Sequence, residues 1–460
     1  MDSTDVTPSL IDALAAFVSR LDARRLPQHV VDAARWRLLD ALGSALWGVH
    51  RGTAQAMREV IEPNGGAQEA TVLGRGLKLP ALAATYLNSS ASPALLDTCR
   101  FSVTHPGIVT VPAALAAAQL AHASGRDLLG GIVAGYEVLT ALGRATRPAD
   151  RGFVPTTVIG PFAAAAAASR ILGLDAPRTA NALALAATTG GGLLDAYAAI
   201  DGGRSQFGRA SEGGVLAALL ARQGVLGNRR ILEGGSLDGT PGFFECFGQP
   251  VDGASVAAAL GRDWGLPYVA AKIHDGCRYT NAAADATLQL MRDHGLRADD
   301  VEAIEVRTFA LALKVSVRNP STVSGALFCI EYVVATALLA GDVFNDKFTL
   351  ERLNDPRTRQ LMSKVSVGLD DALEAAYPQR LGLAMDVLVK DGRRLRSALD
   401  FPRGEPENPV TPEDCTARFR RMAEPLIGAA RAQRIVDMVR DIEALDDVER
   451  LVALCAPADT

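Results

Sequence analysis

Apolar residues recur at helical spacing through about the first 265 residues of this chain, and this pattern constrains the fold more than any other feature. One amphipathic helix is predicted by apolar residues four positions apart, namely Val30, Ala34, Leu38, Leu42 and Leu46. Similar patterns, most of them opened by proline or closed by glycine, predict helices at Pro80–Leu87, Val111–His122, Asp127–Leu142, Pro161–Leu172, Pro177–Thr188 and Ser211–Gln223. Alanine is abundant and aromatic residues make up only 5%, which favours closely packed helices over a sandwich of sheets. The region predicts one helical domain.

After Gly265 the pattern becomes typical of short strands. Alternating or β-rich runs lie at residues 301–306 and 364–367, and two more, at 385–390 and 393–399, flank Asp391-Gly392, a good hairpin signal. One helix is predicted between these runs, at Phe328–Leu339. We expect residues 266–405 to form a smaller α+β domain.

The stretch Phe401–Pro412 is rich in Pro, Gly and Glu and is predicted to be a connector. Helical periodicity returns at Glu413–Ile427 and Ala429–Leu445, and we expect these helices to rejoin the first domain. The predicted fold is mainly α, with a discontinuous helical domain of residues 1–265 and 406–460 and a smaller α+β domain. With 460 residues the chain exceeds the length at which a single hydrophobic core keeps growing, which agrees with two domains.

The overall charge and the cysteine pattern argue against a nucleic-acid partner, a zinc site and a disulfide framework. The net charge is −5, the isoelectric point is near 5.8 and no dense Lys/Arg stripe is present, which argues against a nucleic-acid partner. The histidines are scattered and no two cysteines form a Cys-x-x-Cys pair, so the sequence predicts neither a zinc site nor a disulfide framework. The cysteines concerned are Cys99, Cys246, Cys277, Cys329, Cys415 and Cys455. Free thiols are typical of the reducing cytoplasm, which is the expected location.

The apolar stretches do not predict a membrane protein. Residues Met1–Leu10 lack the basic and apolar regions of a secretory signal. The alanine-rich stretches are interrupted by Gly, Pro, Arg or Asp before the roughly 20 apolar residues that a membrane span needs. We therefore expect no membrane partner.

The segment Lys272–Asn281 combines an amine, an imidazole, a thiol, a guanidinium and a phenol in an otherwise apolar region. It lies where the helical pattern gives way to the α+β pattern, and ligand sites favour domain boundaries. Lys272 could act as a base or hold a carboxylate, and His274 and Tyr279 are candidate proton carriers. Equally, Lys272 and Arg278 could cap a helix while the thiol packs in the core, and the residue types alone leave both interpretations open.

Two further polar segments flank predicted helices. Leu96–Gly107 contains His105, a candidate acid or base, and Arg100, a candidate clamp for a carboxylate, although a solvated loop fits equally well. Arg151–Gly160 contains Thr156, which could line a cleft, although threonines here are more often caps of the following helix.

A fourth segment, Ile200–Ser211, is rich in glycine and leads into a predicted helix. Glycines at a helix N-terminus form a natural anion site, and Arg204 and Arg209 are candidate anion clamps. The segment matches neither a Walker loop nor a dinucleotide-binding fingerprint, since no predicted strand precedes it. A plain loop that enters a helix is the alternative.

Taken together and in this order, short segments along nearly the whole chain resemble the MmgE/PrpD family, which includes 2-methylcitrate dehydratase, cis-aconitate decarboxylase and iminodisuccinate epimerase. Each piece is weak alone, but so many in one order are a strong signal. The matching pieces are Leu26-Pro27, Leu39–Gly43, Leu87-Asn88, His105–Gly107, Pro112-Ala113, Gly135–Val138, Thr156–Gly160, Leu172–Leu174, Ile231–Gly234, Lys272, Cys277–Thr280 and Asn408–Thr411.

The resemblance implies a large helical domain made from both chain ends, a smaller α+β lid, a homodimer, and a site between the domains that uses no metal and no cofactor. Members act on small di- or tricarboxylates by moving a proton on the carbon next to a carboxylate. They then eliminate water, lose carbon dioxide or invert the centre. His105 and Lys272 fall on functional positions of the decarboxylase-like pattern.

Several family positions carry other residues in this chain. The usual histidine after the asparagine is Pro93, and the first aspartate has no secure counterpart, although Asp97 could substitute after a shift of one residue. Other usual histidines or lysines are replaced at Val154, Gly203, Gln206, Cys277 and Asn281. Citrate-type dehydration needs both a base for the carbon acid and an acid for the leaving hydroxyl. These losses argue against an unmodified 2-methylcitrate dehydratase.

The sequence therefore predicts a lyase or isomerase of altered specificity that acts on a small carboxylate as a dehydratase, an epimerase or a double-bond isomerase. The candidate catalytic residues are Lys272, His105, Tyr279 and Asp97. The candidate substrate-binding residues are Arg100, Arg204, Arg209, Arg278, Cys277, His274 and Thr156. The alternative is a non-catalytic binding or scaffold protein that has kept the fold.

Overall fold

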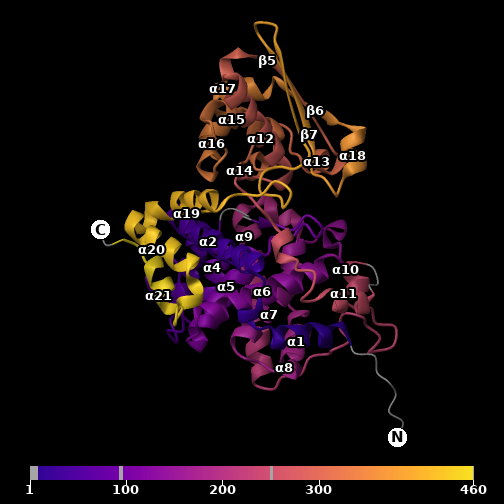
Figure 1. Cartoon of the computed structure of the whole chain (residues 1–460), viewed down its shortest axis with the longest axis vertical. Coiled ribbons are helices and arrows are strands. Elements are labelled where there is room, and N and C mark those ends of the chain that lie inside the picture. The colour runs from indigo at the N-terminus through magenta and orange to yellow at the C-terminus, as the bar shows by residue number, and fades with distance from the viewer. Residues whose placement is uncertain (1–8, 93–96, 249–251, 459–460) are drawn as a thin grey trace. The chain divides into compact units, whose positions relative to one another are not determined.

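The computed structural model describes residues 9–92, 97–248 and 252–458 (Figure 1). The chain divides into two compact units. Unit 1 comprises Met1–Pro93, Cys99–Val269 and Thr411–Thr460, and unit 2 comprises Ala94–Thr98 and Ala270–Val410. The predicted fold class, mainly α with a smaller α+β part, is confirmed.

Unit 1 is built from helices and one short antiparallel hairpin. Its helices are α1 (Leu10–Arg20), α2 (Gln28–His50), α3 (Gln55–Ile61), α4 (Ala81–Ala91), α5 (Gly107–Ala121), α6 (Gly125–Gly143), α7 (Pro155–Ile171), α8 (Ala176–Ala186), α9 (Ile200–Arg222), α10 (Phe243–Phe247), α11 (Gly253–Ala259), α19 (Pro412–Ile427), α20 (Ala429–Arg440) and α21 (Glu449–Val452). The hairpin pairs β1 (Ala70–Val72) with β2 (Leu77–Leu79).

Helix α7 forms the centre of unit 1, because it packs against α5, α6, α8 and α9. Its alanine run, residues 163–168, is fully buried. Small side chains let neighbouring backbones approach. An added Cβ on Gly135 of α6 would lie 2.7 Å from the Ala163 carbonyl oxygen, and one on Gly214 of α9 would lie 2.4 Å from the Pro161 carbonyl oxygen. The alanine content thus serves close helix packing.

Helices α5 and α7 begin before their predicted starts, at Gly107 and Pro155, and each continues through an internal proline. Helix α5 contains Pro112 and helix α7 contains Pro161. A proline inside a helix leaves the carbonyl four residues earlier without its usual N–H donor. Ser89 Oγ donates to that carbonyl in α5 (2.7 Å), and the Gly191 N–H donates to it in α7 (3.2 Å). Donors from elsewhere in unit 1 therefore let both helices run through their prolines.

The C-terminal helices return to the N-terminal part of the chain. Helix α19 packs against α2, so closely that an added Cβ on Gly43 would lie 2.7 Å from Met422 Cε. Helix α20 ends at Arg440 and is followed by a 3-10 turn at Ile442–Ala444. No helix among the described residues is long and apolar enough to span a membrane.

Unit 2 contains a four-stranded mixed sheet in the order β6-β5-β7-β8, with β5 and β6 parallel and the other pairs antiparallel. Its strands are β3 (Asp97–Thr98), β4 (Ala270–Ala271), β5 (Val301–Thr308), β6 (Val365–Leu369), β7 (Leu383–Val389) and β8 (Arg394–Leu399). Its helices are α12 (Arg278–His294), α13 (Ala310–Val315), α14 (Val323–Ala326), α15 (Ile330–Ala340), α16 (Leu350–Asn354), α17 (Pro356–Met362) and α18 (Asp371–Ala376).

The core of unit 2 lies between one face of this sheet and the helices α12 and α15. Alternate residues of β7 are buried, which is the pattern of a strand with one covered face. They form one apolar cluster with buried residues of α12 and α15. The predicted hairpin is confirmed, since β7 and β8 pair directly and Gly392 in the turn has a φ of +90°.

Candidate active site

Segments that are far apart in the sequence meet beside Lys272 in unit 2. Strand β3 pairs with β4 so that Asp97 lies opposite Ala271, the residue before Lys272. The Ala271 N–H also donates to the Gly404 carbonyl oxygen (2.9 Å). Gly404 has a φ of +94°, and an added Cβ would lie 1.9 Å from the Ala271 carbonyl oxygen, so this contact requires glycine. Two predicted catalytic residues, Asp97 and Lys272, are thus carried by neighbouring backbone segments.

Lys272 begins a turn that closes on the protein's own backbone. Its side chain is buried, and Nζ donates a hydrogen bond to the Gly276 carbonyl oxygen. Gly276 has a φ of +99°, which favours glycine. The turn is tied to the rest of unit 2 by Cys277, whose N–H donates to the Leu327 carbonyl oxygen (2.7 Å). The amine is therefore held in a defined position.

Helix α12 begins directly after Cys277, and its first residue, Arg278, makes a buried ion pair with Glu405. The guanidinium donates from Nε (2.9 Å) and from Nη2 (2.5 Å) to Glu405 Oε1, and the two side chains are 3% and 0% exposed. Nη1 donates to Asn281 Oδ1 (3.2 Å) and to the Arg403 carbonyl oxygen (3.3 Å). Because these bonds are all internal to unit 2, they favour a role of Arg278 in holding the segment over one in binding a substrate anion.

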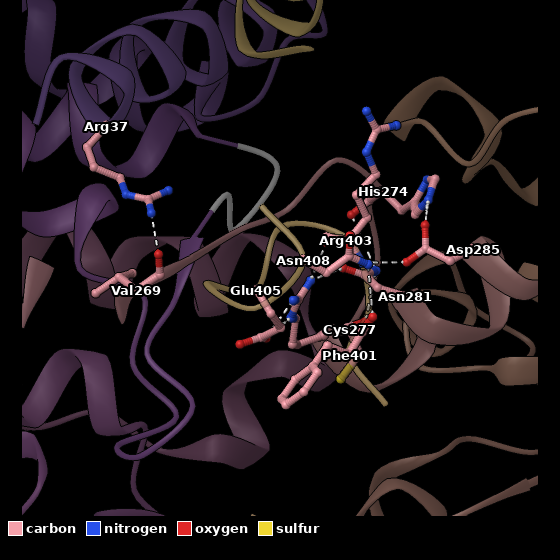
Figure 2. A network of polar contacts seen from close by, with 11 residues as sticks. Arg37, Val269, His274, Cys277, Asn281, Asp285, Phe401, Arg403, Glu405 and Asn408 are labelled. Carbon is pink, nitrogen blue, oxygen red and sulfur yellow. Dashed lines mark hydrogen bonds and ion pairs between the residues drawn. The ribbon is translucent and has the colours of Figure 1, made fainter. Parts of the chain in front are cut away.

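A second carboxylate joins the same network. His274 Nε2 lies 2.9 Å from Asp285 Oδ1, and the other oxygen of Asp285 accepts the Arg403 N–H (2.7 Å), as Figure 2 shows. The Asn281 amide donates to the carbonyl oxygens of His274 (3.4 Å) and Cys277 (3.3 Å). The start of α12 is thus bound to the turn that contains Arg403.

Burial keeps one candidate proton carrier, Tyr279, and the neighbouring Cys277 thiol neutral. Burial raises the pKa of the Tyr279 phenol, and the contact with the Tyr377 hydroxyl raises it further. The Tyr279 ring packs edge-on against Phe309, with 5.4 Å between the ring centroids. Burial likewise raises the pKa of the Cys277 thiol. At neutral pH Tyr279 can donate a hydrogen bond or a proton, but it cannot act as a base.

In unit 1, two predicted residues from different segments contact each other. His105 stands just before α5, and its backbone N–H donates to Thr156 Oγ1 (2.9 Å). Thr156 is fully buried near the start of α7, and the N-cap of that helix is Val154. The expectation of Thr156 as a helix cap is therefore wrong, because its hydroxyl holds the His105 backbone instead.

The remainder of the His105 loop is a tight turn. The Cys99 N–H donates to the Thr104 carbonyl oxygen (2.9 Å), and both residues are buried. Arg100 lies over the Phe101 ring, with its guanidinium carbon 5.1 Å from the ring centroid. The alternative of a solvated loop is wrong over these residues. Pro93 and Leu96, which the sequence also singled out, lie outside the described residues.

The prediction of a glycine-rich loop at residues 200–211 is wrong, because this segment forms the first half of α9. Its glycines are positions of close packing. An added Cβ would lie 2.2 Å from Ser90 Oγ at Gly208, and 2.8 Å from the Tyr197 ring at Gly203. Since the segment lies within the helix, the anion site that was expected from its glycines at a helix entry is absent from this part of the described structure.

The two arginines of the same segment differ in exposure. Arg209 is exposed, pairs with Glu212 (2.9 Å) and lies over the Tyr86 ring at 5.3 Å from the centroid. Arg204 is only 6% exposed. Both are therefore side chains of a continuous helix and not of a phosphate-binding loop.

The sequence missed three residues of the Lys272 network, namely Asp285, Arg403 and Glu405. No motif marks Asp285 in the sequence, and the other two lie in the predicted connector, where charged residues are usually solvated. Glu405 is instead fully buried. The one local hint in the sequence is Gly404, which stands between Arg403 and Glu405. Its reason, the close approach of the Ala271 backbone, is visible only in the folded structure.

A cavity of about 640 Å³ lies elsewhere in unit 1 and contains none of the predicted residues. Burial raises the pKa of Glu137 at its wall to about 7, although its carboxylate accepts the N–H groups of Gly265 (2.9 Å) and Leu266 (2.8 Å). Arg144, also at the wall, pairs with Asp263 (3.1 Å). These polar groups are already bound to other parts of unit 1, so we assign no ligand to this cavity. Among the described residues, no three His, Cys, Asp or Glu side chains form a group that could hold a metal ion.

Comparison with known proteins adds two findings. The models of the MmgE/PrpD N-terminal domain and of the MmgE/PrpD C-terminal domain match residues 12–252 and 274–444. Cis-aconitate decarboxylase-like protein oryM of Aspergillus oryzae is 28% identical over 484 residues, covering 99% of this chain and 99% of that protein. Cis-aconitate decarboxylase of Mus musculus is 26% identical over 464 residues (97% and 93%), and the mitochondrial 2-methylcitrate dehydratase of Yarrowia lipolytica is 27% identical over 350 residues (70% and 65%).

Proposed function

This chain belongs to the MmgE/PrpD family, and on that premise we propose that it is a lyase that acts on a small organic acid with more than one carboxylate. The observation that carries the proposal is the buried Lys272 amine, held in a closed turn of unit 2. An ammonium group in such a place binds a carboxylate strongly and stabilises negative charge that develops next to it. Relatives that match almost the whole chain are named as a cis-aconitate decarboxylase-like protein and a cis-aconitate decarboxylase, which makes loss of carbon dioxide the first reaction to test.

The chemistry that the proposal requires is modest. In a decarboxylation the bond between carbon and the departing carboxylate breaks, the electron pair stays on that carbon, and a proton is then added there. Lys272 would bind a second carboxylate and stabilise the carbanion, and a neighbouring acid would supply the proton. Dehydration would also need an acid for the leaving hydroxyl, whereas epimerisation or double-bond migration needs only removal and return of a proton.

The test uses cis-aconitate in heavy water, with detection of carbon dioxide and mass spectrometry of the product. Decarboxylation gives a product lighter by carbon dioxide with deuterium on carbon, dehydration or hydration changes the mass by water, and isomerisation leaves only exchanged deuterium. We expect Lys272→Ala to lower turnover by at least about 100-fold. The matched control is Lys390→Ala, an exposed lysine of the same unit. Turnover in Lys272→Ala equal to that of the control would remove Lys272 from the mechanism.

A non-catalytic binding protein is the second candidate, and the internal bonds of Arg278 and Asn281 favour it, since these polar groups are not left for a substrate. A ligand that binds the folded protein raises its melting temperature. If cis-aconitate or 2-methylcitrate raises the melting temperature but neither acid is converted at high protein concentration, this second candidate replaces the first.

The exposed apolar residues support the proposal of a homodimer. Of the large hydrophobic side chains that are exposed among the described residues, more than half lie within residues 193–237: Leu193, Leu194, Leu216, Leu220, Val225, Leu226 and Leu237. Exposed apolar residues that gather on one surface mark protein interfaces, and we propose that this stretch of unit 1 contributes to one. Leu220→Glu should convert a dimer to a monomer in light scattering, whereas Leu350→Glu, on an exposed residue of unit 2, should not. A monomeric wild-type protein would contradict the proposal.

A further inference from the structure

The pair of His274 and Asp285 in unit 2 is a titratable couple that the proposed mechanism does not yet use (Figure 2). Their side chains are 10% and 15% exposed, and Nε2 lies 2.9 Å from Oδ1. Asp285 Oδ2 accepts the Arg403 N–H (2.7 Å), so both oxygens of the carboxylate are bound. The carboxylate is therefore held in place against the imidazole by a second hydrogen bond.

This geometry selects one form of the neutral imidazole. A carboxylate only accepts hydrogen bonds, so the proton of the neutral ring lies on Nε2 and the lone pair lies on Nδ1. Within the described residues Nδ1 makes no hydrogen bond. His274 is thus arranged as a base at Nδ1 when neutral and as an acid at Nδ1 when protonated, and its bond to Asp285 persists in both states.

Three other polar side chains of the segment, Cys277, Tyr279 and Asn281, do not offer this capacity. Burial raises the pKa of both Cys277 and Tyr279, which stay protonated at neutral pH. Asn281 does not titrate, and its amide is bound to Arg278 and to two carbonyl oxygens. Imidazole is the side chain whose protonation ordinarily changes between pH 5 and 8. His274, two residues after Lys272, is therefore better suited than these three side chains to exchange a proton.

We propose that His274 is the proton carrier for the reaction at Lys272 and that Asp285 is its positioning residue. This inference rests on the proposed function and deepens it. When the bond to the departing carboxylate breaks, the protonated ring gives its Nδ1 proton to the carbon that keeps the electron pair, and the neutral ring then takes a proton from water. In an isomerisation the neutral Nδ1 instead takes a proton from carbon and returns it to another position.

Turnover of cis-aconitate tests the role of His274. In His274→Gln the amide nitrogen can still donate to Asp285 but cannot titrate, so we expect kcat to fall about 100-fold with KM within about threefold of wild type. Asp285→Asn should lower kcat about tenfold or more, because it frees the ring to adopt the other tautomer. The matched control is His122→Gln. The His122 side chain is 84% exposed and also lies near a carboxylate, with Nδ1 3.6 Å from Asp447 Oδ2. This control variant should turn over like wild type. Wild-type turnover in His274→Gln would overturn the inference.

Nitrogen-15 NMR of the histidine rings tests the role of Asp285 without any substrate. We expect the wild-type His274 ring, assigned by its loss in His274→Gln, to show a protonated Nε2 and an unprotonated Nδ1 at alkaline pH, and Asp285→Asn to mix the two tautomers. A protonated Nδ1 in the wild type, or an unchanged ring in Asp285→Asn, would contradict the positioning role. If the wild type converts no acid while the ring behaves as expected, the proposed function and the proton-transfer role fail, but the role of Asp285 in setting the tautomer stands.

Discussion

The segments Lys272–Asn281 and Ile200–Ser211 both looked, from the sequence, like polar approaches to a helix, yet they fold in opposite ways. The first stays outside its helix until Arg278, and its backbone turns through Gly276 with a φ of +99°. The second is helical throughout. Glycine is needed in the first for a backbone angle, and in the second for the space that a side chain would fill.

The difference teaches that glycine content does not by itself distinguish a binding loop from a packed helix. In α9, Gly208 is needed because Ser90 and Tyr86 of α4 lie against its backbone. In the Lys272 turn, the surrounding charges pair with partners from distant positions, such as Glu405. The deciding facts in both segments are contacts with residues far away in the sequence.

The largest expected effect tests the buried ion pair of the Lys272 segment. Removing one partner of a buried pair leaves the other charge uncompensated, so Glu405→Gln and Arg278→Met should each lower the free energy of unfolding by about 3–5 kcal/mol. Urea denaturation of the two single variants and of the double variant gives the coupling. We expect the double variant to lose much less than the sum. Strictly additive losses would show that the pair does not hold the segment. The exposed pair of Arg393 and Asp391 is the control, and Arg393→Met should cost less than about 1 kcal/mol.

The second prediction compares Glu405 with Glu137, a buried carboxyl of unit 1 whose carboxylate accepts the backbone N–H groups of Gly265 and Leu266. Its folded-state pKa of about 7 lies above the ordinary value of 4.5, so the folded protein binds this proton more tightly than the unfolded chain does. The stability it contributes is therefore fully present below pH 4.5 and is lost as the pH rises to 7, by about 3 kcal/mol at most.

Glu137→Gln should remove this part of the pH dependence. The measurement is the free energy of unfolding at several pH values between 4.5 and 7, in the variant and in wild type. Glu302→Gln, on an exposed residue of β5, should keep the wild-type slope. An identical slope in Glu137→Gln and in wild type would contradict the raised pKa.

The third prediction distinguishes, within α9, a glycine with close neighbours from a glycine that has space around it. Gly208→Ala places a methyl group 2.2 Å from Ser90 Oγ and should lower the free energy of unfolding by about 1–3 kcal/mol. Gly202→Ala meets only the Ala196 carbonyl oxygen at 3.6 Å and should raise it by up to about 1 kcal/mol, because alanine favours helix. Equal effects of the two substitutions in thermal or urea unfolding would show that close packing does not decide these positions.

The smallest expected effect concerns Arg209, which the sequence suggested as an anion clamp. Its pair with Glu212 is largely exposed, so Arg209→Ala should change the free energy of unfolding by less than about 1 kcal/mol. It should also leave the KM for cis-aconitate unchanged. A severalfold rise of KM would return Arg209 to the substrate-binding set.

Most of the long helices and all four strands of the mixed sheet could be predicted, because their hydrophobic periodicity is a local property of the sequence. The starts of α5, α7 and α9 could not. In α5 and α7, hydrogen bonds from Ser89 and Gly191 replace those that the internal prolines cannot donate. In α9, glycines inside the helix leave space for neighbouring residues that pack closely against it. Such compensation comes from other segments and leaves no mark in the helix's own residues.

For the candidate site, the residue types singled out the Lys272 segment, but they did not reveal how its groups are bound. Arg278 looked like a substrate clamp until Glu405 was found beside it, and His274 looked like one candidate among several until Asp285 was found at its ring. Both partners are ordinary acids in the sequence.

The sequence by itself determined the helical character of unit 1, the hairpin of unit 2 and the family, since these depend on periodicity and on the order of short motifs. Only the tertiary structure decided which charges are paired, which glycines are spacers and which imidazole nitrogen faces a carboxylate. The physical reason is that hydrophobic periodicity is a property of consecutive residues within one element. A buried charge is instead stabilised by a partner that is close in space, and the fold decides which distant residues, such as Arg278 and Glu405, are brought together.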